Sequence, residues 1–307
     1  HTDAIEINYN DGLAGQTSQR NLTGTAVGPA SLAVSDGATY DFGTLATGAS
    51  ADKAFTITNS GAFTASAMAG AGLAAPFTFK NGTYPGTGGN CGASLAPAGT
   101  CTIVVTYAPS ATGTQNDTIE INYNDGANAQ QAARAVTGLG AAPALLAISD
   151  GATFDFGSKA NGSATDKSFT ITNSGGVTAT AMSGSGLAAP YAFKGGGYPG
   201  TGGTCNTTLA AAGTCTVVVT FSPTVTGTHT DTIDIAYNNG ASAQTSSRDL
   251  TGQSAGPANI TITDGPTYNF GSKANGSTTE KTMTLTNTGA FTATAMTGSG
   301  LAAPYTF

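Results

Sequence analysis

The chain has 307 residues, of which only 9% are charged and 44 are glycine, and its net charge is −7. The 10 Lys and Arg residues are scattered through an acidic chain and cannot neutralise a phosphate backbone, so nucleic-acid binding is excluded. No apolar run approaches the roughly 18 residues that a membrane-spanning helix needs, so we expect no membrane span here.

Short strands separated by turn residues are expected along the chain. Strands are predicted over residues 32–34, 40–42, 53–59, 63–68, 76–79, 101–107, 117–124 and 134–137. The segment 53–59 alternates strictly, with Phe55 and Ile57 predicted to point inward and Thr outward. A Gly-rich loop at 81–90 precedes the most apolar strand, and no segment carries a helical stripe. Many short strands with frequent turn signals predict an all-β sandwich.

This pattern is repeated. The motif Asp36-Gly-Ala-Thr-Tyr-Asp-Phe-Gly43 returns at 150–157 and again at 264–271, each time 114 residues further on. Residues 31–144 align with 145–258 without a gap. At about 114 residues, each complete repeat is long enough to bury its own core.

The repeats define the expected domains. Residues 31–144 and 145–258 are complete repeats, 1–30 match the C-terminal part of a repeat, and 259–307 match its N-terminal part. The stretch equivalent to 80–114 is missing from both partial copies, and we therefore expect these residues to be a window on a longer array. Short junctions that contain Pro limit swivelling, so the tandem domains are expected to form an extended rod.

An ordered set of motifs carries a family resemblance. It comprises Asn59-Ser-Gly61, a Cys-x9-Cys pair leading into an apolar strand, Tyr107-Ala-Pro-x3-Gly113 and a closing Val136-Thr-Gly138. In this set the chain resembles the Ig-like repeats of bacterial choice-of-anchor type surface proteins, which are similar to abnormal-spindle/hydin-like Ig-like domains. The resemblance implies tandem immunoglobulin-like sandwiches on an exported, surface-attached or extracellular protein. It implies no catalysis and no cofactor.

The four cysteines occur as one pair in each complete repeat, which predicts the disulfides Cys91–Cys101 and Cys205–Cys215. Structural zinc needs four ligands, which neither repeat supplies from two Cys and at most one His. The expected role of each disulfide is to fix the Gly-rich loop onto the sandwich.

Two further sets of side chains are candidates for binding. Tyr84 and Tyr198 lie in the Gly-rich loops, where an aromatic ring either contacts a ligand or subunit or folds back over the sandwich edge. The carboxylates of Asp36, Asp41, Asp150 and Asp155 are weak calcium candidates. Their spacing matches no EF-hand, and Asx turns beside glycine account for them equally well. We otherwise expect no metal site, and no Ser or Thr has the partners of a catalytic triad.

The sequence therefore favours a non-enzymatic structural protein of an extracellular or cell-surface fibre, stalk or sheath. Few ionic groups would need desolvation on contact, so self-association into fibres or lateral packing of like chains is expected. The alternative is the spacer array of a surface adhesin whose binding domain lies elsewhere. A carbohydrate-binding module would need exposed aromatic rings, and the absence of Trp leaves a glycan ligand unsupported.

Overall fold

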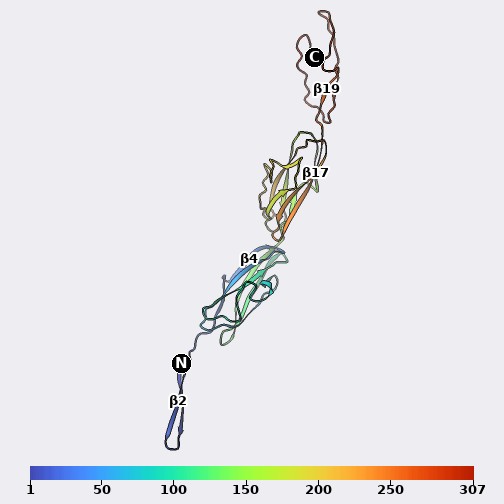
Figure 1. Ribbon diagram of the computed structural model, residues 1–307. Coiled ribbons are helices and arrows are strands. Elements are labelled where there is room, and N and C mark those ends of the chain that lie inside the picture. Colours follow the sequence, from blue (N-terminus) through green and yellow to red (C-terminus); the bar gives the residue numbers. More distant parts are fainter. The chain divides into compact units, whose positions relative to one another are not determined.

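The computed structural model describes residues 1–307 and divides into two compact units, His1–Pro143 and Ala144–Phe307. Each unit contains one complete β-sandwich together with a smaller pair of strands (Figure 1). Helix is confined to a single short 3-10 turn, and none is long and apolar enough to cross a bilayer.

The first sandwich consists of two four-stranded sheets, ordered β3-β5-β8-β7 and β4-β10-β9-β6. The bounds are β3 (Leu32–Val34), β4 (Thr39–Ala46), β5 (Ala51–Asn59), β6 (Ser66–Ala71), β7 (Phe77–Phe79), β8 (Thr100–Tyr107), β9 (Gly113–Asn124) and β10 (Ala129–Ala141). All neighbours are antiparallel except β4 and β10, which are parallel. Two packed sheets connected in this way form an immunoglobulin-like sandwich, as the sequence predicts.

The chain changes sheets between β3 and β4. Asp36 and Gly37 both have positive φ there, 73° and 74°. Only glycine and, to a lesser extent, Asp or Asn adopt this conformation readily, so the Asp-Gly dipeptide is suited to the bend. β3 consequently pairs with β5, while β4 pairs with β10 on the opposite sheet.

The core lies between the two sheets and follows the predicted alternation. The side chains of Phe55, Ile57, Ile103 and Val105 are fully buried, and Thr56, between the first two, is exposed. In β8 the residue between the second two is Val104, which is buried as well. Burying each such apolar side chain contributes roughly 1.5–3 kcal/mol before the cost of chain ordering. The core of the complete repeat is therefore self-contained.

Two local features differ from the predicted strands. The strand expected over 63–68 is β6, at Ser66–Ala71, and its pairing with β9 shifts register between Ser66 and Ala69. Ala67 has a φ of 51° and forms the bulge responsible for the shift. A 3-10 turn at Lys80–Gly82, which the pattern does not predict, begins the Gly-rich loop.

The second sandwich repeats the first, with sheets ordered β11-β13-β16-β15 and β12-β18-β17-β14. Its strands are β11 (Leu146–Ile148), β12 (Thr153–Ala160), β13 (Thr165–Asn173), β14 (Thr180–Ser185), β15 (Tyr191–Phe193), β16 (Thr214–Phe221), β17 (Gly227–Asn238) and β18 (Ala243–Ala255). It too has a separate buried core.

The partial copies form only strand pairs. β1 (Thr2–Asn10) and β2 (Gly15–Thr23) make a hairpin, and β19 (Ile260–Ile262) pairs with β20 (Leu285–Asn287). Figure 1 shows the β1–β2 hairpin without a facing sheet. The side chains of Ile5 and Ile7 are 50% and 58% exposed, whereas their equivalents Ile119 and Ile121 in the complete repeat are 0% exposed. Burial of this apolar face therefore depends on the facing sheet and not on the hairpin itself.

A buried asparagine ties the two sheets together beside the core. Asn59, at the end of β5, is fully buried. Its Oδ1 accepts hydrogen bonds from the backbone N–H of Ser31 and of Gly61, at 3.1 and 3.0 Å. Its Nδ2 donates to the carbonyls of Phe63 and Leu95, at 2.8 and 3.0 Å. One side chain thus satisfies four backbone groups from three separate loops, and Asn173 does the same in the second repeat.

Replacing this asparagine should destabilise its repeat. We expect Asn59→Ala to lower the free energy of unfolding of the first sandwich by about 2–4 kcal/mol, because buried backbone groups lose their partners. Urea denaturation followed by hydrogen exchange of first-repeat peptides measures this. Asn116→Ala is the control, since Asn116 is exposed on β9, and its loss should change stability by less than about 0.5 kcal/mol. Equal effects of the two substitutions would contradict the role of Asn59.

Candidate contact site at the disulfide loop

The most elaborate loop of each sandwich connects the third and fourth strands of one sheet. In the first repeat it spans residues 80–99, between β7 and β8, and we call it the strap. Cys91 in the strap is bonded to Cys101 in β8, with the two Cα atoms 4.9 Å apart. Both cysteines are buried. The predicted disulfide is therefore present, and it attaches the loop directly to a core strand.

The strap continues the sheet beyond the short strand β7. The backbone N–H of Asn90 and of Cys91 donate to the carbonyl of Thr102, at 2.9 and 3.1 Å. In return, the N–H of Val104 donates to the carbonyl of Pro85 at 2.8 Å. The strap therefore occupies the edge of β8 that β7 leaves free, because β7 pairs only with residues 105–107.

The same loop also covers the edge of the other sheet. Leu95 and Ala65 exchange backbone hydrogen bonds of 2.9 and 3.0 Å, and the N–H of Met68 donates to the carbonyl of Ala93 at 3.0 Å. The Leu95 side chain is buried in the core. The strap thus links β8 of one sheet to β6 of the other, closing one whole side of the sandwich.

Tyr84 folds back over the sandwich within this loop. Its ring meets Phe79 edge-on, with centroids 5.7 Å apart, and its hydroxyl lies 3.4 Å from the carbonyl of Gly92. A Cβ at Gly70, on the edge strand β6, would lie 2.6 Å from the Tyr84 ring, so glycine makes room for it. Burial raises the pKa of the Tyr84 hydroxyl. Of the two interpretations open from the sequence, this geometry favours the ring as a cover for the sandwich edge.

The second repeat builds the same strap from residues 194–213. Cys205 and Cys215 are bonded with Cα atoms 4.8 Å apart. Tyr198 packs edge-on against Phe193, with centroids 5.8 Å apart, and burial raises the pKa of its hydroxyl as well. The N–H of Val218 donates to the carbonyl of Pro199 at 2.8 Å. The strap is therefore a property of the repeat and not of one copy.

The aspartates considered for calcium form ion pairs and turn hydrogen bonds within the fold. Asp36 pairs with the ammonium of Lys53 at 3.0 Å and Asp150 with Lys167 at 2.9 Å. A hydrogen bond from Ser35, followed by that from Lys53, lowers the pKa of the Asp36 carboxyl.

The second aspartate of each pair closes a turn. Asp41 accepts a hydrogen bond from the N–H of Gly43 at 2.7 Å, and Asp155 accepts one from Gly157 at the same distance. No three side chains of His, Cys, Asp or Glu converge on one point of the structure. The four candidate carboxylates therefore lie in ion pairs and turns and are not gathered into one cluster.

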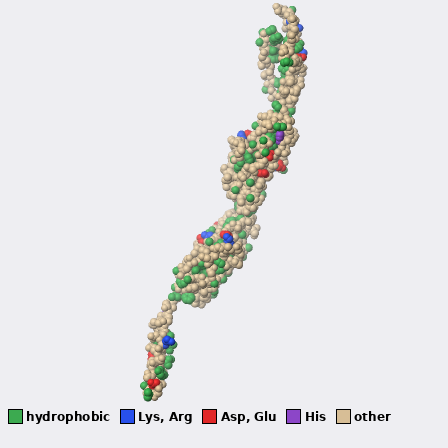
Figure 2. Space-filling model, in the orientation of Figure 1, with side chains coloured by type: hydrophobic (Ala, Val, Ile, Leu, Met, Phe, Trp, Pro, Cys, Tyr) green, Lys and Arg blue, Asp and Glu red, His purple; other side chains and the backbone are tan.

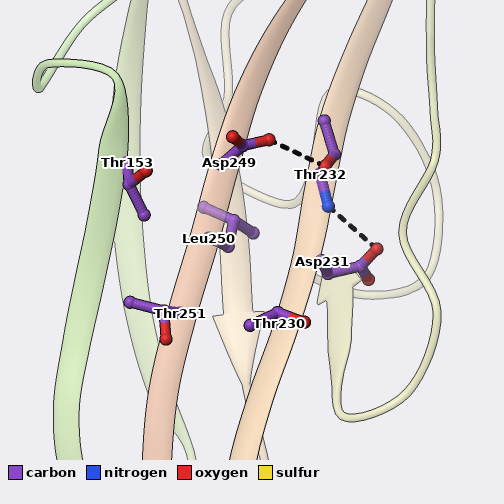
Figure 3. A pocket seen from close by; sticks show the side chains of 7 residues that line it. All are labelled: Thr153, Thr230, Asp231, Thr232, Asp249, Leu250 and Thr251. Atoms are coloured by element: carbon purple, nitrogen blue, oxygen red, sulfur yellow. Dashed lines mark hydrogen bonds between the residues drawn. The ribbon is translucent and has the colours of Figure 1, made fainter.

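A shallow groove on β17 and β18 was not anticipated from the sequence (Figure 3). It is lined by hydroxyl and carboxylate groups together with one apolar side chain: Thr153, Thr230, Asp231, Thr232, Asp249, Leu250 and Thr251. The carboxylate of Asp249 accepts a hydrogen bond from the Thr232 hydroxyl at 3.0 Å, and that of Asp231 accepts one from the Thr232 N–H at 2.9 Å. Neither lysine, histidine nor cysteine lines the groove. The first repeat has Ala135 in place of Asp249, so this acidic groove belongs to one copy only.

The remaining surface is sparsely charged. Figure 2 shows few charged side chains on the face in view, in small groups surrounded by uncharged polar and apolar groups. The five ion pairs all join a lysine to an aspartate. Most lysines of the structure are therefore engaged in ion pairs within the fold.

The comparison with known proteins agrees with this architecture. The family model described as "HYDIN/CFA65/VesB-like, Ig-like domain" matches residues 33–138 and 148–252. No curated protein matches the chain.

Solved structures with a similar fold have low sequence identity. A Porphyromonas gingivalis W83 protein of unknown function is 12% identical, covering 72% of this chain and 99% of that one, with a TM-score of 0.28. Vibrio cholerae VesB protease is 15% identical, covering 36% of this chain and 32% of that one, with a TM-score of 0.29. The ASH/PapD-like domain 7 of human CEP192 is 14% identical, covering 39% of this chain and 89% of that one, with a TM-score of 0.28.

The stability of the second sandwich should depend on pH in the alkaline range. Tyr191 is 1% exposed, and its hydroxyl donates to the carbonyl of His229 at 3.1 Å. Burial, with smaller contributions from Asp231 and Asp155, raises the pKa of Tyr191 to about 12 from its ordinary value of 10.0. Because the folded state holds this proton more tightly than the unfolded state, its stabilisation is complete below pH 10 and is lost as pH rises towards 12.

Tyr191→Phe should therefore flatten the pH profile of second-repeat stability between pH 10 and 12. At neutral pH the variant should lose only about 1 kcal/mol, the worth of one hydrogen bond. Urea denaturation monitored by circular dichroism at a series of pH values measures both effects. Tyr9→Phe, in the exposed β1–β2 hairpin, should leave the profile unchanged. Parallel profiles for Tyr191→Phe and the parent chain would show that Tyr191 is not the titrating group.

Proposed function

The chain belongs to the HYDIN/CFA65/VesB-like Ig-like domain family, and we propose that it is a structural protein of an extracellular or cell-surface fibre, stalk or sheath. In this role the Ig-like repeats act as independent, disulfide-braced building blocks connected in series. The observation that carries the proposal is that each complete repeat closes its own core and uses its polar side chains for internal bonds.

The internal use of polar groups supports a structural role. The buried asparagines, the strap and the Lys–Asp pairs are all engaged within their own repeat. Catalytic sites instead bring reactive groups together in a cleft with perturbed ionisation. The perturbed tyrosines of this chain are core and strap residues, which is the pattern of a scaffold.

Disulfides support an exported location. One local disulfide braces each complete repeat, and neither repeat contains a free cysteine. Disulfides of this kind persist in oxidising compartments and are rare where thiols are kept reduced. An extracellular or cell-surface setting is therefore the one in which the disulfides of this fold stay oxidised.

Lateral association through sheet faces fits the surface better than association through sheet edges. The edge strands β3 and β7 have three residues each, β4 and β6 are bulged, and the strap covers one side. Short, bulged or covered edges suppress pairing between molecules. The outer face of β5 presents Thr56 and Ala54, both exposed and uncharged, next to Asp52, which is already paired with Lys80 at 2.7 Å. Contact there therefore desolvates a single ion pair.

The alternative proposal is a spacer array within a surface adhesin. It is favoured by the groove of Figure 3, because the first repeat has Ala135 in place of the groove residue Asp249. The groove therefore cannot serve as a common binding site for the array. Under this alternative the repeats hold a separate binding domain away from the surface and do not associate with one another.

The two proposals predict different behaviour of the oxidised chain. Lateral packing predicts filaments or sheets in electron microscopy and a sedimentation coefficient that rises with concentration. Introducing lysine at the uncharged end of this face, as Thr56→Lys with Thr170→Lys, should shift the onset of association to at least tenfold higher concentration by burying a charge. Ala127→Lys with Ala241→Lys places the same charges in exposed turns and should leave association unchanged. Chains that stay monomeric at all concentrations would favour the spacer and contradict the fibre.

A further inference from the structure

The strap covers a strand with a strong tendency to pair. The segment Thr102–Tyr107 reads Thr-Ile-Val-Val-Thr-Tyr, and its counterpart Thr216–Phe221 reads Thr-Val-Val-Val-Thr-Phe. Both are rich in β-branched and aromatic residues and contain no charge, Pro or Gly. Segments of six residues with this composition readily form intermolecular β-structure when an edge is exposed.

In the folded repeat the strap satisfies this edge. The N–H of Thr102 donates to the side chain of Asn90 at 2.7 Å, and the N–H of Val104 donates to the carbonyl of Pro85 at 2.8 Å. On the other sheet, the N–H groups of Ala65 and Met68 donate to strap carbonyls at 3.0 Å. If the strap moved away, both sheets would present unpaired donors on the same side of the sandwich.

The only covalent tether between the middle of the strap and the sandwich is the disulfide. Its loop closes ten residues, from Cys91 to Cys101. In the chain-entropy account, a crosslink of that size shifts an opening equilibrium by about 100-fold. The remaining contacts are backbone hydrogen bonds, the bond from Asn59 Nδ2 to the carbonyl of Leu95, and the side chains of Leu95 and Tyr84. We expect these contacts to open locally while the pairing of β5 with β8 persists.

We propose that the disulfide-tied strap is a redox-controlled cover over the sheet edge. Reduction of the disulfide exposes the edge of β8, and of β16 in the second repeat, for pairing with a second copy of this chain. In the chemical step, a dithiol reductant gives two electrons and two protons to the disulfide. Cys91 and Cys101 become thiols, and the reductant becomes a cyclic disulfide. The strap then leaves the edge of β8, and an antiparallel strand from the second copy takes up the donors of Thr102 and Val104.

A second copy is the occupant that this edge fits. The exposed groups are backbone donors and acceptors flanked by uncharged side chains, so they carry no charge pattern that would select a different partner. The segments of the two repeats are nearly identical, so each copy of the chain supplies matching strands twice. Pairing of like segments in an antiparallel ladder satisfies the donors and acceptors of both. This inference concerns the reduced chain and stands apart from face-to-face packing of the oxidised one.

Hydrogen exchange and sedimentation of the whole chain test the proposal. After treatment with dithiothreitol, we expect the amides of Thr102, Val104, Ala65 and Met68 at low protein concentration to exchange about 100-fold faster. The amides that join β5 to β8, such as that of Phe55, should stay protected. At higher concentration the reduced chain should form larger species, with protection regained at Thr102 and Val104. Uniform exchange across β5 and β8 would mean global unfolding and would overturn the proposal, as would a reduced chain that stays unassociated.

Variants separate edge pairing from other effects of the reductant. Replacing all four cysteines by serine should reproduce the associated state without reductant, and dithiothreitol should then change nothing. Adding Thr102→Lys and Thr216→Lys to that variant places a charge on each exposed edge and should reduce the association at least tenfold. Ala127→Lys with Ala241→Lys in the same background is the matched control and should leave association intact. Equal association of both lysine variants would overturn edge pairing, whatever the oxidised chain does.

Discussion

The disulfide-tied strap is the constraint that closes one side of each sandwich. A sandwich of two four-stranded sheets has four open edges, and a loop that bonds to β8 and to β6 covers part of both sheets on one side. The bond between Cys91 and Cys101 fixes this loop against a buried strand, so that a glycine-rich segment with little packing of its own becomes part of the sheet. The glycines that make the loop costly to order are the same residues that let its backbone approach β8. A Cβ at Gly86 would lie 2.2 Å from the carbonyl of Val104.

The opposite side of the sandwich solves the same problem with backbone geometry. The bend at Asp36-Gly37 divides the first strand between the sheets, leaving only Leu32–Val34 on one and a bulged strand, β4, on the other. Neither piece offers a long, flat row of unpaired backbone groups. Lys53 then pairs with Asp36 and lies 4.8 Å above the ring of Tyr40, which places a charge at this corner. One side of the sandwich is closed by a disulfide-tied loop. On the other side the edge strand is divided between the two sheets, and a charged side chain lies beside it.

Much of this fold follows from local sequence patterns, and the rest depends on contacts between distant residues. The alternation of Phe55 and Ile57 and the Cys-x9-Cys spacing are properties of short segments, which is why the strands and the disulfides could be predicted. The position of β6 could not, because its bulge at Ala67 is set by pairing with β9 and with the strap. The role of Asn59 was equally hidden, since it bonds to loops that meet only in the folded sandwich. The groove on β17 and β18 requires the register of two strands, and a Thr-rich sequence gives no sign of which hydroxyls face each other.

The differences between the two repeats show which atoms the fold must satisfy. In the first, the Tyr107 hydroxyl donates to the Gln115 side chain at 2.5 Å, whose Nε2 donates to the carbonyl of Ala111 at 3.0 Å. In the second, phenylalanine and histidine stand at those positions, and the ring nitrogen Nε2 of His229 lies 3.0 Å from the carbonyl of Val225, the equivalent of Ala111.

The same histidine nitrogen also lies 3.0 Å from the hydroxyl of Ser254. A third change accompanies the other two, since Gly140 becomes Ser254, whose hydroxyl also donates to the Val225 carbonyl, at 2.6 Å. In both repeats the same loop carbonyl has polar partners. They are the amide of Gln115 in the first repeat, and the imidazole of His229 and the hydroxyl of Ser254 in the second. His229, which is half-buried on β17, is therefore explained by this structural requirement. Two repeats with different polar groups keep the same fold because the backbone acceptor, not the side chain, is what has to be preserved.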